Sequence, residues 1–153
     1  GGGAGAVGCQ ARDSTVSATA GGTAYSLTDA AGGFGGAGSY IADGMIGPTA
    51  PSYGEPGPVS GARYFAGGGG GGGGAGGYAG GPIPEMNGGG VGGGGNGGTP
   101  NYMPGPSGAS CRASTAGATN MGAGGGGRTT TPGGTCQGAN GGSGIVLIRY
   151  KFQ

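Results

Sequence analysis

The chain has 153 residues, of which 52 are glycine, and six basic residues nearly balance five acidic ones, for a net charge of +1. Leu, Ile, Val and Phe together make up only about a tenth of the chain, which excludes an ordinary hydrophobic core. Because the sequence is almost neutral and has no basic run, nucleic acid and anionic lipid are not expected as partners.

The chain begins with GGGAGAVG, which contains neither an initiator Met nor a signal peptide. We therefore expect a processed product or a fragment of a longer polypeptide. No apolar run approaches the ~20 residues that a membrane-spanning helix requires, so membrane insertion is not expected.

Glycine is concentrated in runs that alternate with segments rich in side chains. The runs cover residues 1–8, 32–38, 67–81, 88–98, 122–127 and 138–144. A helix costs about 1 kcal/mol for each glycine relative to alanine, and a glycine strand has no side chains to pack. The polyproline II conformation, called polyglycine II when it is built from glycine, has three residues per turn and directs every N–H and C=O outward.

Outward-facing amides and carbonyls need partners, and only glycine lets neighbouring backbones come close enough to supply them. We therefore predict a mostly irregular fold in which residues 1–144 form a bundle of packed polyglycine II helices with long connecting loops. No α-helix is expected.

The connecting segments carry most of the tyrosines, among Ser, Pro, Asn and Gly. This composition is typical of recognition surfaces, because a rigid amphipathic ring contacts a ligand at a low entropy cost. The alternative is that the rings cover the edges of the glycine bundle, which we favour for Tyr64 and Tyr78 beside the long run. The candidate receptor-contact residues are Tyr25, Tyr40, Tyr53 and Tyr102.

The three cysteines, Cys9, Cys111 and Cys136, leave one thiol unpaired if a disulfide forms. Three states are open: a Cys111–Cys136 bridge, three reduced and buried thiols, or a bond from Cys9 to another chain. The last of these states would place the protein in an oxidising, extracellular setting.

Catalytic and cofactor motifs are not expected. The chain has no histidine and no CxxC pair, which excludes Ser-His-Asp and Cys-His arrangements and gives no metal site. Matches to GxGxxG arise from composition alone, since no Walker lysine follows them. We predict that the protein is not an enzyme and binds no cofactor or metal; its carboxylates, far apart in sequence, are Asp13, Asp29, Asp43, Glu55 and Glu85.

The end of the chain, GIVLIRYKFQ, alternates as a β-strand does. One face of this strand is apolar. The other face is apolar at Ile145 and Leu147 and charged at Arg149 and Lys151. We predict a strand over residues 145–153 that packs on the same domain or on a neighbouring subunit, because an uncovered edge of this kind aggregates. The best internal partner is the segment 62–66, and the apolar face comprises Val146, Ile148, Tyr150 and Phe152.

Two stretches, VSGARYFAGGGGGGGGAGG and GGSGIVLIRYKF, resemble the glycine-rich domain at the ends of bacteriophage tail-fibre and other virion proteins. The similarity spans most of the chain. It implies a sandwich of polyglycine II helices that presents variable loops to a host-surface receptor. On this basis we expect a structural and adhesive protein on a virion surface or outside the cell, which self-associates and contacts a host glycan or outer-membrane protein.

The alternative is a self-assembling subunit of an extracellular glycine-rich filament. In that case the unpaired terminal strand and Cys9 would join neighbouring copies.

Overall fold

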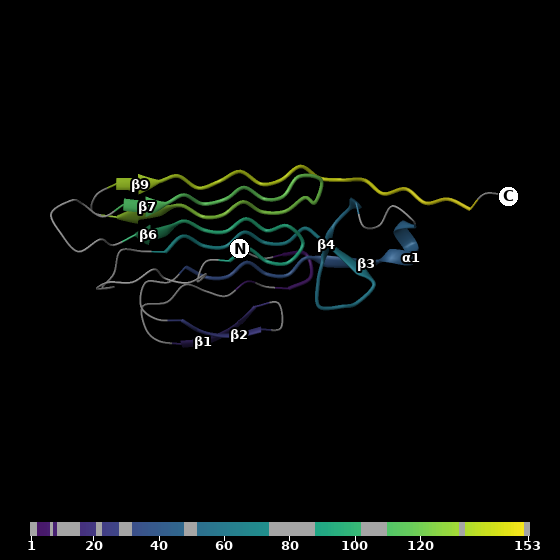
Figure 1. Cartoon of the computed structure of the whole chain (residues 1–153), viewed down its shortest axis with the longest axis horizontal. Coiled ribbons are helices and arrows are strands. Elements are labelled where there is room, and N and C mark those ends of the chain that lie inside the picture. The colour runs from purple at the N-terminus through teal and green to yellow at the C-terminus, as the bar shows by residue number, and fades with distance from the viewer. Residues whose placement is uncertain are drawn as a thin grey trace.

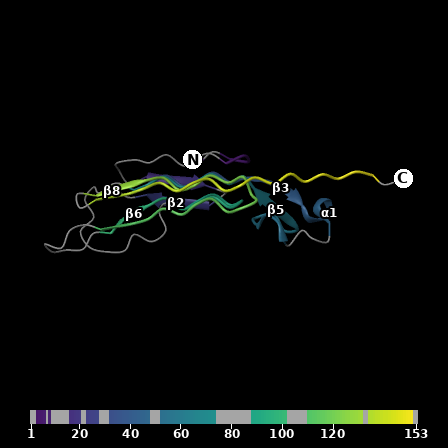
Figure 2. The same ribbon diagram turned by 90° about the horizontal axis from the view of Figure 1, so that it is seen from above.

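The structure is a computed structural model, and it describes residues 3–6, 8, 16–20, 23–27, 32–47, 52–73, 88–101, 110–131 and 134–151. The described chain is mostly non-helical, and its strands are short and antiparallel. Extended segments run back and forth along the long axis of an elongated molecule (Figure 1, Figure 2).

The strands of the described chain form four small sheets. Three are two-stranded pairs: β1 (Val16–Ala20) with β2 (Thr23–Leu27), β6 (Thr99–Asn101) with β7 (Ser110–Arg112), and β8 (Thr129–Thr131) with β9 (Gly134–Cys136). The fourth has the order β3-β5-β4, from β3 (Ser39–Ala42), β5 (Ala62–Phe65) and β4 (Glu55–Pro56). Helix α1 (Asp43–Ile46) follows β3 directly.

Residues 67–73 are extended and donate hydrogen bonds to two different neighbours. Every third amide bonds a carbonyl of residues 92–98 at 2.9–3.0 Å, in the pairs Gly67 to Gly92, Gly70 to Gly95 and Gly73 to Gly98. The amides one position further along face another segment, where Gly68 bonds Gly36 and Gly71 bonds Gly33. The first neighbour runs parallel to residues 67–73, and the second runs antiparallel.

Three parallel segments close a hydrogen-bonded triangle. Residues 67–73 donate to residues 92–98, Gly95 and Gly98 donate to residues 124–127, and residues 124–127 donate back to Gly67 and Gly70. Residues 113–118 and 137–142 lie against this group with the same spacing; for example, Ala139 bonds Gly126 and Gly142 bonds Ala123. Each segment thus presents a different row of amides to each neighbour.

The interior is filled mainly by backbone. Within the described ranges the buried hydrophobic side chains are Phe34, Ala62, Tyr64 and Ala123, whereas buried glycines occur in nearly every extended segment. A Cβ atom added at Gly69, Gly72 or Gly126 would overlap a backbone carbonyl of a neighbouring segment. The close approach of the segments therefore requires glycine at these positions.

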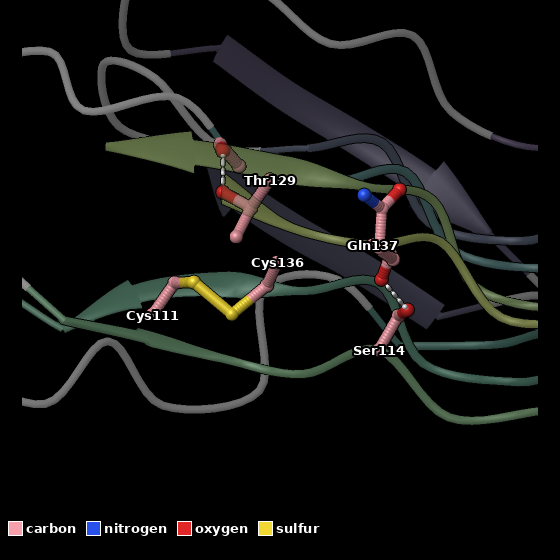
Figure 3. Close-up of a disulfide and its surroundings, with 6 residues drawn as sticks. Cys111, Ser114, Thr129, Cys136 and Gln137 are labelled. Carbon is pink, nitrogen blue, oxygen red and sulfur yellow. Dashed lines mark hydrogen bonds between the residues drawn. A yellow bond between two sulfur atoms is a disulfide. The ribbon is translucent and has the colours of Figure 1, made fainter. Parts of the chain in front are cut away.

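A disulfide and a buried threonine join the extended segments at the end that carries β6 to β9 (Figure 3). Cys111 in β7 is bonded to Cys136 in β9, with 6.0 Å between their Cα atoms. This bridge is one of the three states that the sequence left open, and Cys9 lies outside the described residues. Thr129 in β8 is almost fully buried, and its Oγ1 donates to the carbonyl of Gly73.

Two predictions about regular structure need correction. The expectation of no α-helix is wrong for α1, a single turn that ends where Gly47 adopts a φ of 90°. The expectation of long connecting loops is wrong where β1 pairs with β2 and β8 pairs with β9: GG and PG lie between these strands, and both dipeptides are turn signals.

The predicted terminal strand is not formed within the described chain. Residues 145–151 are extended, but they belong to no β-ladder. The segment 62–66 does form a strand, β5, but both of its edges are occupied, by β3 and β4. It is therefore not the partner of the terminal segment, and pairing with another subunit stays a prediction.

Candidate functional site

The β3-β5-β4 sheet places two tyrosines side by side. Tyr40 of β3 stands opposite Tyr64 of β5 in the register, and their ring centroids are 5.4 Å apart with 42° between the ring planes. Tyr64 is 6% exposed, while Tyr40 is 55% exposed. The tyrosine of the central strand β5 is therefore buried, and the tyrosine of the edge strand β3 is exposed to solvent.

Gly57 makes room for the Tyr64 ring. A Cβ atom at this glycine would lie 2.5 Å from two ring carbons of Tyr64. The chain that follows β4 therefore passes closely over the ring and helps to bury Tyr64.

A shallow depression of about 440 Å³ lies beside the tyrosine pair. Its lining contains two tyrosines, one proline, one serine and small residues, without a charged side chain. Such a surface suits a neutral ligand or an apolar side chain rather than an ion. The lining residues are Gly5, Ala6, Ala37, Gly38, Ser39, Tyr40, Pro58 and Tyr64.

Glu55 holds a backbone turn against the same sheet. Its Oε2 accepts hydrogen bonds from the amides of Gly92 and Gly93, each at 2.8 Å. Both glycines have positive φ, 101° and 86°, which orients their consecutive N–H groups toward one acceptor. No local sequence pattern predicts this contact, because the residues lie 37 and 38 positions apart.

A charged pair joins β5 to α1. Arg63 Nε lies 3.4 Å from Asp43 Oδ1, without the geometry of a hydrogen bond. Of the five carboxylates, Asp43 and Glu55 thus have structural contacts. Asp13, Asp29 and Glu85 lie outside the described residues.

The structure does not gather the four candidate receptor tyrosines. Tyr40 borders the depression, Tyr53 is half-buried just before β4, and Tyr25 belongs to β2 in a separate sheet. Tyr102 and Tyr78 lie outside the described residues. The residue that meets Tyr40 is Tyr64, for which the sequence favoured a covering role.

The C-terminal segment, residues 145–151, is the most exposed apolar feature of the described chain. Val146, Ile148 and Tyr150 are 83%, 82% and 80% exposed. None of the seven residues makes a backbone hydrogen bond to another described residue, and the contact that holds them is a 3.3 Å bond from Arg149 Nη1 to the carbonyl of Gly44. Figure 1 shows this segment running past α1 and beyond the end of the body. Phe152 lies outside the described residues.

Comparison of the chain with protein-family models, curated proteins and solved structures found no match. Across the residues placed by the structure, no three His, Cys, Asp or Glu side chains come together as a metal site. The same residues contain no helix with the length and apolarity needed to cross a membrane.

Proposed function

We propose that the extended glycine segments form a polyglycine II lattice. The observation that supports this is the spacing of the hydrogen bonds, in which every third residue of a segment faces the same neighbour. A helix with three residues per turn has this spacing. In a β-strand, by contrast, the hydrogen bonds to each of two neighbours repeat every second residue. Residues 67–73 bond three neighbouring segments, which a strand in a flat sheet does not do.

The lattice serves as the rigid body of a non-enzymatic structural and adhesive protein outside the cell or on a virion surface. The Cys111–Cys136 bridge supports this location, because disulfides persist in oxidising compartments. The resemblance to the glycine-rich domain of bacteriophage tail fibres supports the adhesive role.

The receptor is a host glycan or an outer-membrane protein, and Tyr40 is the contact residue that the geometry supports best. It is exposed, it lies beside a depression without charged side chains, and Tyr64 packs against its ring. Aromatic rings of this kind contact sugars and apolar side chains through their faces.

Binding of the purified, fluorescently labelled protein to bacterial cells and to a glycan array tests the adhesive role. Tyr40→Ala should weaken binding, and Val59→Ala, at an exposed hydrophobic position outside the depression, is the control. Absence of binding to every cell type and glycan would contradict the adhesive role. Binding that Tyr40→Ala leaves unchanged would place the contact elsewhere on the surface.

A second function, as the self-assembling subunit of an extracellular filament, is favoured by the exposed C-terminal segment. An amphipathic extended segment without backbone partners is the kind of edge that pairs with another chain. Negative-stain images of the purified chain separate the two functions: long polymers support a filament subunit, and discrete particles support a fibre tip.

A further inference from the structure

We propose that residues 145–151 of one copy add as a strand to the free edge of β3 in a second copy of the chain. This inference rests on the self-assembly proposed above and names the two surfaces that meet.

The donor is ready to pair. Residues 145–151 are already extended, their backbone amides and carbonyls have no partner among the described residues, and their apolar row of Val146, Ile148 and Tyr150 faces solvent. Little backbone rearrangement is then needed on binding, which lowers the entropy cost of strand addition.

The acceptor is the edge strand β3. In the sheet order β3-β5-β4 it has one neighbour, so its outer edge carries no strand among the described residues. On one face of this sheet Ala62 and Tyr64 are buried, but Ala42 and Tyr40, which stand opposite them, are exposed. A strand added beside β3 would extend this face and cover both residues.

The side chains of the two surfaces match in spacing and in kind. Tyr40 and Ala42 are two residues apart on one face of β3, as are Val146 and Ile148 in the donor. Aromatic and β-branched side chains are favourable cross-strand pairs. The depression beside Tyr40 has a volume of about 440 Å³, and no charged side chain in its lining opposes an apolar residue of the donor.

Charge favours a second copy as the occupant. Asp43 follows β3 directly and is paired with Arg63, but its side chain remains 37% exposed and can also attract Arg149 or Lys151 of the donor. The net charge of +1 leaves little repulsion between copies. The donor of the same copy is held beside α1 by Arg149 and leads away from the body (Figure 1).

The two surfaces differ, so the contact between copies is heterologous: each copy gives one strand and receives one. A contact of this type extends into a polymer unless it closes on itself. It therefore supplies a route to the filament considered above.

Photo-crosslinking in a mixture of isotopically light and heavy protein tests the contact. The light chain carries p-benzoylphenylalanine in place of Tyr40, and the heavy chain is unmodified. We expect crosslinks from position 40 of the light chain to heavy peptides that contain residues 145–151. The same probe at Val59, which is also exposed but lies outside β3, should give none.

A pair of substitutions in the donor provides a second measurement. Ile148→Lys places a charge in the apolar row and should weaken self-association by about tenfold or more, because an unpaired ammonium group would be buried in the contact. Leu147→Lys adds the same charge on the opposite face and should weaken it less than about threefold. Sedimentation velocity measures both.

Crosslinks confined to a single chain, or heavy–light crosslinks to other peptides, would overturn the proposal, and so would equal effects of the two substitutions. Polymers seen in negative-stain images of a sample that gives no β3 crosslink would show that the chain self-assembles through a different contact. Failure of self-assembly itself would appear as discrete particles in the same images.

Discussion

Replacing Gly117 with alanine should disrupt the glycine bundle at one defined hydrogen bond. The amide of Gly142 donates to the carbonyl of Ala123 at 2.8 Å, and these two atoms belong to segments that flank residue 117. A Cβ atom at Gly117 would lie 2.7 Å from the donor nitrogen and 2.5 Å from the acceptor oxygen. The added methyl group therefore contacts both ends of the bond between them.

The size of the effect follows from these distances. Cβ contacts in proteins are rarely below 3.0 Å, so the segments must separate by about 0.5 Å. Overpacking of this kind costs about 1–3 kcal/mol, and the weakened hydrogen bond adds about 0.5–1.5 kcal/mol. We expect Gly117→Ala to lower the free energy of unfolding by about 2–4 kcal/mol. For a chain of this length that loss corresponds to a fall in Tm of roughly 5–15 °C.

Two controls separate packing from conformational preference. Ala116 and Ala118 flank the site, so the extended segment already accommodates alanine. Gly144→Ala adds the same methyl group where nothing lies within 4 Å, and it should change the free energy of unfolding by less than about 0.5 kcal/mol. Calorimetry and amide hydrogen exchange of Gly142 measure the effects. If Gly117→Ala is as stable as Gly144→Ala, close backbone contact does not hold the bundle together.

Three further changes test the contacts at the two ends of the body. Thr129→Val leaves the Gly73 carbonyl buried without its donor and should cost about 1–3 kcal/mol, whereas Thr130→Val on the exposed side should be nearly neutral in denaturant titration. Glu55→Gln keeps an acceptor but loses the charge and should cost about 1–2 kcal/mol, with faster amide exchange at the turn it holds; unchanged exchange would show that the carboxylate does not fix the turn. Reduction of the disulfide, whose cysteines are 25 positions apart, should cost about 3.5 kcal/mol in the loop-entropy model, and an unchanged urea midpoint would contradict this.

The sequence indicated the nature of the interior but not the partners within it. A run such as residues 67–73 excludes a side-chain core by composition, and the burial of its glycines agrees. Its neighbours could not be predicted, because every position of a glycine run gives the same local signal. The turns between segments also involve distant residues: the amides of Gly92 and Gly93 both donate to the carboxylate of Glu55.

The candidate site was predictable only in part. Tyr40 was identified by the composition around it, but its partner Tyr64 could be found only from the register of β3 and β5. The apolar row of the C-terminal segment was clear from its alternation, yet alternation shows that a segment can pair and not which edge it meets. Among the described residues the edges of β5 are taken by β3 and β4, and the terminal segment pairs with no strand.

The two ends of the bundle therefore differ in structure (Figure 1). At one end, the Cys111–Cys136 bridge and the buried Thr129 tie β7, β8 and β9 to the extended segments. At the other end lie the exposed ring of Tyr40, the projecting residues 145–151 and the edge of β3 that has no strand beside it among the described residues. A lattice of backbone hydrogen bonds has few side chains with which to bind a partner, so specific contacts must come from the segments where glycine gives way to other residues. Both proposals for function, receptor contact and strand addition, accordingly place the partner at the end that is not closed by the disulfide.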